Sequence, residues 1–172
     1  VEDNIKVGFH HRAGYAMTDA LLRARAFRKA EAEIAEKTEE LLALFGLTDR
    51  RSDPARSLPY GEQRRLEIAR AMATGPRLLL LDEPVAGMNP SESRQLMELL
   101  LKLRREFDLT MLLIEHDMKF VMDICERIIV LDGGEIIASG PPRQICSDPA
   151  VIEAYLGASM AAGNGGAGDA QG

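Results

Sequence analysis

The chain lacks the features of several protein classes. No apolar stretch approaches the roughly 18 residues that a membrane-spanning helix needs, and nothing at its start resembles a secretory signal peptide. Its two cysteines, Cys125 and Cys146, have neither metal-binding nor redox spacing, so we interpret them as reduced structural thiols. The formal net charge of −6 disfavours nonspecific binding to nucleic acid or anionic lipid. These absences favour a cytosolic, peripheral protein that reaches a membrane only through a partner.

The most informative stretch is a short apolar run, Leu78 to Leu81, that ends in the adjacent carboxylates of Asp82 and Glu83. Pro76 and Pro84 bound this run at strand length, which favours a buried strand over a piece of core helix. Carboxylates at the carboxyl end of such a strand lie where open α/β sheets bind ligands. The alternative is an Asp-Glu-Pro turn that merely closes a core strand.

Two further segments weigh against that alternative. Residues 58–72 predict a turn and a helix whose amino-terminal end favours an anion, and Gly61 lets the backbone approach it closely. Residues 110–114 predict a second apolar strand, which places His116 at the same sheet edge as the two carboxylates. Taken alone, a histidine after a strand is more often a hydrogen-bonded structural residue.

The remaining elements are predicted from periodicity and from glycine or proline breaks. In chain order they are two helices within 17–45 that end at Gly46, a polar loop at 48–57, a crossover helix at 92–107, a helix at 119–125, a hairpin at 128–138 and short helices at 141–156. The crossover helix between two strands predicts a right-handed βαβ unit. From residue 158 onward few residues can build a core, which predicts a disordered tail.

Together these segments resemble the carboxyl-terminal two thirds of an ATP-binding-cassette (ABC) transporter ATPase subunit. The resemblance covers residues 1–157, and its motifs stand in the family's order. They are Leu58-Pro59-Tyr60-Gly61-Glu62-Gln63 (signature), Leu78 to Glu83 (Walker B strand), Ala86-Gly87-Met88-Asn89-Pro90 (D-loop) and His116 (switch histidine).

Within that family, the chain resembles the ATP-binding subunits of branched-chain amino-acid importers. The ending Val151 to Gly157 is the sharpest sign, and the opening Val1 to Gly8 resembles the segment that leads their helical subdomain. The transported solute is not written in an ATPase subunit, so leucine, valine, another amino acid, or urea and amides stay open.

The resemblance implies an α/β fold: the carboxyl-terminal part of a P-loop NTPase of the ABC ATPase type, with parallel strands, a helical subdomain and a short helical tail. The expected boundaries are 1–57 for part of the helical subdomain, 58–140 for the signature, Walker B, D-loop and switch-histidine part, 141–157 for the tail helices and 158–172 for the disordered tail.

The resemblance also implies a site for ATP and Mg²⁺ between two subunits. Asp82 is expected to hold Mg²⁺, Glu83 to act as general base, and His116 to meet the γ-phosphate or the attacking water. The ATP of the opposite subunit is expected to meet the signature residues Pro59, Tyr60, Gly61, Glu62 and Gln63. The loop of Asn89 is expected to cross the dimer interface.

Two departures from the family stand out. The general signature has a serine where this chain has Pro59, which offers neither a hydroxyl nor an N–H. In this respect the chain resembles many members of the branched-chain branch, which have proline at the same position. The phosphate-binding loop Gly-x-x-x-x-Gly-Lys-Ser/Thr is absent. We therefore expect that the chain is a fragment whose missing loop belongs upstream of Val1, and that alone it hydrolyses no ATP.

The resemblance implies a transport-coupled ATPase of the translocase class at the cytoplasmic face of the inner (plasma) membrane. Its expected partners are permease subunits, a second ATPase subunit (homo- or heterodimer) and, indirectly, a periplasmic substrate-binding protein, with no nucleic acid. Two alternatives remain. One is an ABC ATPase of another system, such as urea or amide import, lipopolysaccharide export or DNA repair. The other is a truncated, non-catalytic ABC module.

Overall fold

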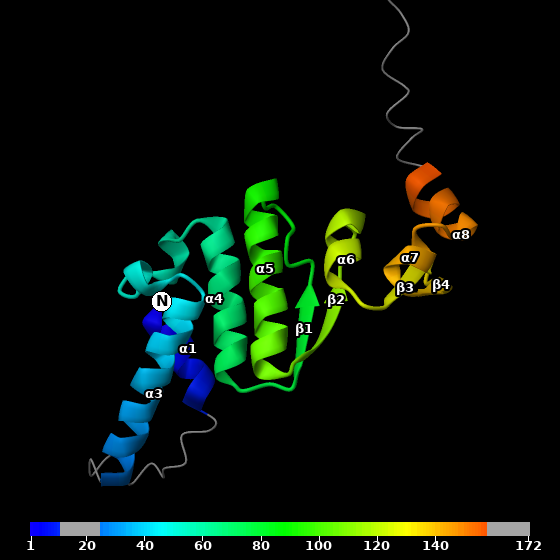
Figure 1. Ribbon diagram of the computed structural model, residues 1–172. Coiled ribbons are helices and arrows are strands. Elements are labelled where there is room, and N and C mark those ends of the chain that lie inside the picture. The colour runs from blue at the N-terminus through cyan, green and yellow to red at the C-terminus, as the bar shows by residue number, and fades with distance from the viewer. Residues whose placement is uncertain (11–24, 158–172) are drawn as a thin grey trace, which may run out of the picture. The chain divides into compact units, whose positions relative to one another are not determined.

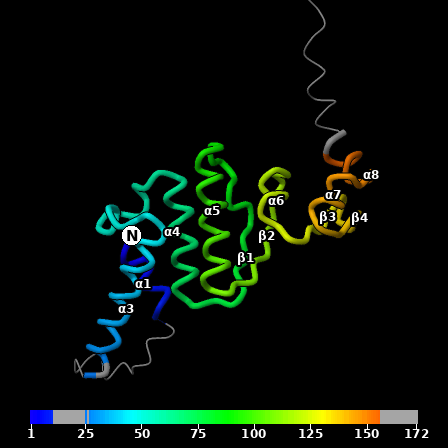
Figure 2. Tube along the Cα trace, in the orientation of Figure 1, coloured from blue at the N-terminus to red at the C-terminus, as the bar shows by residue number. Residues whose placement is uncertain are grey.

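The computed structural model of the chain describes residues 1–10 and 25–157 (Figure 1, Figure 2). These residues divide into two compact units, one up to Glu115 and one from His116 onward. Residues 17–24 of the predicted two-helix region and the predicted disordered tail after residue 157 lie outside the described residues.

The first unit begins with three helices that pack on one another: α1 (Glu2–Phe9), α3 (Arg25–Leu44) and α4 (Tyr60–Ala73). Ile5 of α1 and Leu42 of α3 are fully buried in this core. Gly8 allows α1 to lie against α4, because a Cβ there would come within 2.5 Å of the carbonyl oxygen of Arg70. Two 3-10 turns, Thr48–Arg50 and Ala55–Ser57, lead into α4.

A strand, helix and strand complete the first unit: β1 (Leu78–Asp82), α5 (Pro90–Phe107) and β2 (Thr110–Ile114). The strands pair in parallel, with Leu78 opposite Thr110 and Asp82 opposite Ile114. Figure 1 shows α5 between α4 and β1. The helix buries Leu96, Leu100 and Leu103, which recur at the spacing of one helix face. This is the predicted β-helix-β unit with its two strands side by side.

The prediction of a fully buried strand is wrong for one face of β1. Leu79 and Leu81 are 4% and 7% exposed, whereas Leu78 and Leu80 are 52% and 65% exposed. Leu112 and Ile114 of β2 are exposed as well. Among residues 1–10 and 25–157, the sheet is therefore covered on one face only. A run of leucines does not distinguish that arrangement from a sheet covered on both faces.

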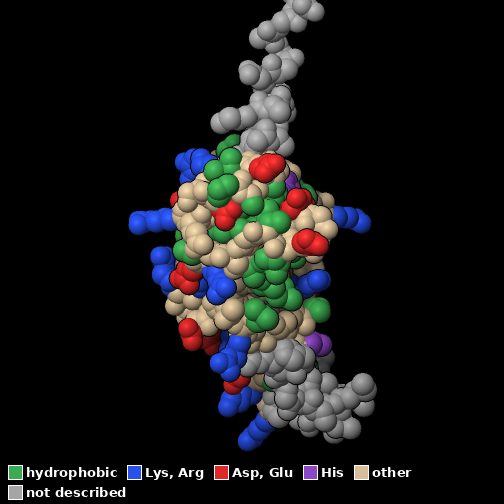
Figure 3. All heavy atoms as spheres, turned by 90° about the vertical axis from the view of Figure 1, so that its right-hand side faces the viewer, with side chains coloured by type: hydrophobic (Ala, Val, Ile, Leu, Met, Phe, Trp, Pro, Cys, Tyr) green, Lys and Arg blue, Asp and Glu red, His purple; other side chains and the backbone are tan. Residues whose placement is uncertain are grey.

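The second unit consists of α6 (Met118–Ile124), a hairpin of β3 (Ile128–Asp132) and β4 (Glu135–Gly140), and short helices α7 (Pro142–Ile145) and α8 (Pro149–Val151). A π-helical segment, Ile152–Gly157, follows, and its Tyr155 hydroxyl donates to the carbonyl of Leu131. Ile129, Leu131 and Ile136 of the hairpin are exposed. Figure 3 likewise shows hydrophobic side chains gathered near the middle of the face turned toward the viewer.

Most of the predicted elements are confirmed within about two residues, including the crossover helix, both parallel strands and the hairpin. The end of the second helix near Gly46 is confirmed as well: α3 ends at Leu44, and Gly46 has a φ of 65°. Helix α1 was not predicted. It has no side-chain cap and is only eight residues long, so its stability comes from packing on α3 and α4, which a local pattern does not reveal.

Candidate functional site

The two adjacent carboxylates lie where β1 ends. Asp82 is the last residue of the strand, opposite Ile114, and its side chain is exposed. The next residue, Glu83, has a φ of 43°, which is uncommon for a residue other than glycine, and its N–H donates to the carbonyl of Ile114 over 2.9 Å. The chain therefore turns sharply at Glu83 while it stays tied to the neighbouring strand.

The turn after Glu83 is held by a carboxylate that the sequence analysis did not assign. The Val85 N–H donates to Glu115 Oε1 over 3.1 Å, and the Ala86 N–H donates to the carbonyl of Glu83 over 3.2 Å. Glu115 directly follows β2, so it fastens the segment after one strand to the segment after the other. Its place after an apolar strand was the only signal for it in the sequence.

The D-loop leads into α5 through a capping box. Asn89 Oδ1 accepts from the N–H groups of Ser91 and Glu92 over 2.9 and 3.0 Å, and Glu92 Oε2 accepts from the Asn89 N–H over 2.9 Å. Asn-x-x-Glu before an apolar run is a sequence pattern for this cap, which the sequence analysis did not use. Asn89 is therefore fixed at the first turn of α5.

The signature segment forms the start of α4. Pro59 is the residue before the helix and provides no side-chain cap; its carbonyl accepts from the N–H groups of Glu62 and Gln63 over 2.9 and 3.0 Å. An uncapped helix start leaves backbone N–H groups that suit an anion. Gly61 is buried, because the side chain of Glu92 lies against it.

The longer signature side chains have partners within the first unit. Gln63 Nε2 donates to the carbonyl of Leu58 over 2.8 Å, and Arg50 Nε donates to Glu62 Oε2 over 3.1 Å. Arg64 Nε donates to the Tyr60 hydroxyl over 3.1 Å. These contacts fix the shape of the helix start, and they leave its backbone N–H groups as the groups that can face an anion.

The signature segment, Asp82, Glu83 and the D-loop all belong to the first unit, and within it the signature segment lies against the D-loop at Tyr60 and Gly87. His116 follows Glu115 as the first residue of the second unit, and its side chain is exposed. The next residue, Asp117, caps α6 by accepting from the Phe120 N–H over 3.1 Å.

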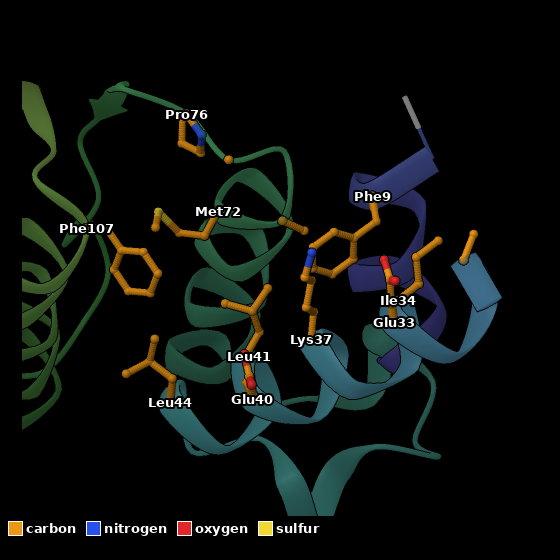
Figure 4. A pocket seen from close by; sticks show the side chains of 13 residues that line it. Phe9, Glu33, Ile34, Lys37, Glu40, Leu41, Leu44, Met72, Pro76 and Phe107 are labelled. Atoms are coloured by element: carbon orange, nitrogen blue, oxygen red, sulfur yellow. The ribbon is translucent and has the colours of Figure 1, made fainter. Parts of the chain in front are cut away.

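A cavity of about 590 Å³ opens elsewhere in the first unit (Figure 4). Its apolar lining comes from α1, α3, α4 and the end of α5, and includes Phe9, Leu41, Met72 and Phe107. Charged side chains of α3, among them Lys37, also line it. None of the predicted site residues lines this cavity.

Nothing in the described residues forms a self-sufficient metal centre: residues 1–10 and 25–157 contain no cluster of three His, Cys, Asp or Glu residues placed to hold an ion. The exposed carboxylate of Asp82 still fits Mg²⁺, because this ion prefers oxygen ligands and is commonly held by one or two carboxylates together with substrate phosphates. In the same ranges no helix is both long and apolar enough to cross a membrane.

Comparison with known proteins decides the family. Residues 2–86 match the family profile "ABC transporter", and the chain is 45% identical over 157 residues to the "High-affinity branched-chain amino acid transport ATP-binding protein LivG" of Escherichia coli K12. The chain belongs to the ABC transporter ATPases. Residues 135–161 match a second profile, "Branched-chain amino acid ATP-binding cassette transporter". The resemblance seen in the sequence is confirmed, including its branched-chain branch.

Other members of the ABC family match over similar lengths. The related protein BraF of Pseudomonas aeruginosa is 46% identical over 155 residues. These matches cover 91% of this chain for LivG and 90% for BraF, but only 62% and 61% of those relatives. The chain therefore spans somewhat less than two thirds of the length of the curated relatives that it matches.

A solved ABC structure shares the fold. The ATP-binding cassette MJ1267 is 29% identical, with a TM-score of 0.72 over 90% of this chain and 61% of that chain. The predicted fold class, a P-loop NTPase of the ABC ATPase type, is confirmed.

Proposed function

We propose that the chain acts in the ATP-hydrolysing subunit of an ABC importer for branched-chain amino acids. The observation that carries this proposal is the pair Asp82–Glu83 at the carboxyl end of β1, with the uncapped signature helix and the capped D-loop in the same unit. Phosphoryl transfer depends on positioned charges more than on covalent help from the protein, and this arrangement supplies them.

Each carboxylate has its own role. Asp82 lies at the strand edge and would hold Mg²⁺, which when bound neutralises charge on the phosphate oxygens. Glu83 follows in a fixed turn and would accept a proton from the attacking water as general base. His116 would hydrogen-bond the γ-phosphate or that water.

The start of α4 is proposed to bind the ATP held by a second copy of the subunit or by a related subunit. Pro59 offers no hydroxyl, so this contact would rest on Gly61, the neighbouring backbone and the positive end of the helix dipole. The loop of Asn89 would meet the same interface.

Residues 1–57 are proposed to contact the permease. The cavity between α1, α3 and α4 supports this, because it offers apolar surface flanked by charged residues in that region (Figure 4). The subunit would then work at the cytoplasmic face of the inner membrane, with a periplasmic binding protein as an indirect partner.

The tail supports branched-chain amino acids as the cargo. The branched-chain relatives LivG and BraF match 91% and 90% of this chain, whereas the "Lipopolysaccharide export system ATP-binding protein LptB" of Haemophilus influenzae is 38% identical over 71% of it. The profile match over residues 135–161 points the same way.

The proposal is tested in a loop-bearing subunit, defined as this chain preceded by the phosphate-loop segment of the E. coli relative LivG. We expect Mg²⁺-dependent phosphate release from ATP. Glu83→Gln should slow it by about 10² to 10⁴, the usual contribution of a general base, while ATP still promotes dimerisation.

Glu98→Gln, an exposed glutamate on α5, is the matched control and should leave the rate unchanged. The chain without the added segment should show no hydrolysis above background. Turnover by Glu83→Gln within a few fold of the unsubstituted loop-bearing subunit would refute the general-base role.

A further inference from the structure

Two glycines mark a close approach between the signature segment and the D-loop within one chain. A Cβ added at Gly87 would lie 3.4 Å from Cε1 of the Tyr60 ring. A Cβ added at Gly61 would lie 3.2 Å from Oε1 of Glu92. The signature segment therefore lies against the D-loop at Gly87 and against the first turn of α5 at Glu92.

Arg64 holds the ring of Tyr60 in its orientation. The guanidinium carbon of Arg64 lies 5.2 Å from the ring centroid, and Arg64 Nε donates to the Tyr60 hydroxyl over 3.1 Å. Arg64 is fixed in turn by Glu67, whose Oε2 accepts from it over 2.8 Å. An otherwise mobile surface tyrosine, 44% exposed, is thus oriented toward Gly87.

On the D-loop side, the backbone conformation of Gly87 and the contacts of Glu92 define the position of the loop. Gly87 has a φ of 76°, a conformation that a residue with a Cβ adopts only under strain. Glu92 lies against Gly61 with one carboxylate oxygen and accepts from the Asn89 N–H with the other. A displacement of the start of α4 would therefore be felt at both ends of the D-loop.

We propose that Tyr60 is a positioning residue that fixes the D-loop, residues 86–90, against the start of α4 within one subunit. This inference rests on the proposed function, in which the signature segment contacts the nucleotide of one site while the D-loop follows the carboxylates of the other. Tyr60 then acts on the reaction through the D-loop and not by touching ATP.

The contact itself is tested in the 172-residue chain by NMR. The Tyr60 ring should shift the Gly87 Hα signals upfield. Tyr60→Phe keeps the ring and should keep the shift, whereas Tyr60→Leu should abolish it and move the amide signals of Met88 and Asn89. Tyr155→Leu, in the second unit, is the control and should leave these signals in place. Unchanged D-loop signals in Tyr60→Leu would overturn the proposal.

Adding a methyl group tests the same contact from the other side. Gly87→Ala places a methyl group in van der Waals contact with the Tyr60 ring and should therefore change the chemical shifts of the ring signals. Gly134→Ala has a similar backbone requirement, with a φ of 88°, but nothing lies within 4 Å of its added Cβ. It should therefore leave the Tyr60 signals unchanged, and equal effects of the two substitutions would contradict the contact.

The consequence for turnover is measured in the loop-bearing subunit. Tyr60→Leu should lower kcat on the order of tenfold, because a displaced reacting geometry is costly, while KM for ATP changes by less than about twofold. Tyr60→Phe should restore most of the rate. A raised KM with an unchanged kcat would instead make Tyr60 a nucleotide contact and overturn the proposal. If the unsubstituted subunit hydrolyses no ATP, the proposed function fails, and the NMR comparison still decides whether Tyr60 fixes the D-loop.

Discussion

The two faces of the β1–β2 sheet are built from the same kind of residue and differ in what covers them. Leu79 and Leu81 lie on the face covered by helices and are almost fully buried. On the opposite face, Leu80 and its neighbour in register, Leu112, are 65% and 56% exposed. Because strand side chains alternate between faces, one leucine run supplies both surfaces.

This difference shows which face of the sheet holds β1 in place next to the candidate site. The covered face secures β1 through the crossover helix, and the site residues Asp82 and Glu83 lie where that strand ends. In residues 1–10 and 25–157, no element buries the opposite face. Within the described residues, the packing that supports the strand end with its two carboxylates therefore comes from the covered face.

The largest effect on this comparison is expected from truncating one leucine on each face. Leu79→Ala should lower the free energy of unfolding by about 2 to 5 kcal/mol, because it leaves a cavity under the helices. Leu80→Ala should change it by no more than about 0.5 kcal/mol. Urea denaturation followed by circular dichroism measures both.

Equal losses for the two variants would mean that the bare face is covered in solution. The same pair of substitutions in the loop-bearing subunit shows whether the added segment covers this face. If it does, Leu80→Ala should become as destabilising there as Leu79→Ala.

Helices and strands whose ends are marked by proline, glycine or capping residues could be predicted from the sequence. The first strand is bounded by Pro76 and Pro84, and the helix that follows it begins with an Asn-Pro cap and ends at Asp108 with a left-handed φ of 49°. The exposed face of the β1–β2 sheet could not be predicted, because an unbroken run of leucines gives the same pattern whether one face of the sheet or both are covered. Helix α1 was missed because its stability depends on partners distant in the sequence.

The site divides in the same way. The strand-end carboxylates and the signature turn could be found from residue types next to strand and helix ends. The Tyr60–Gly87 contact and the Glu115–Val85 hydrogen bond could not, because no local pattern connects segments so far apart. The sequence therefore predicts candidate catalytic groups next to strand and helix ends, whereas the contacts that position those groups are visible only in the structure.

A smaller effect is expected from the cap of the helix that lies over the covered face. Asn89→Ala removes the acceptor of the Ser91 and Glu92 N–H groups, so it should lower the free energy of unfolding by about 1 kcal/mol, within 0.5 to 2. Ser91→Ala keeps both N–H groups and is the control, with an expected change within about 0.5 kcal/mol. Urea denaturation on the same protein preparation separates the two, and a loss no larger than the control's would mean that the first turn of α5 contributes little to the covered face.

The smallest expected effect is a difference in labelling rate between two thiols of the second unit, one partly buried and one exposed. Burial raises the pKa of the Cys125 thiol, whereas Cys146 is exposed. Only the thiolate reacts, so the raised pKa lowers the thiolate fraction of Cys125 at a given pH, and its partial burial limits the access of a reagent. Iodoacetamide should therefore label Cys146 faster than Cys125, by roughly threefold or more near pH 8, as followed by peptide mass spectrometry.

Raising the pH should accelerate the labelling of Cys125, because it increases the thiolate fraction of that thiol. In concentrated urea the two rates should converge, because the difference belongs to the folded state. Equal rates in the folded chain would show that Cys125 opens to solvent as readily as Cys146.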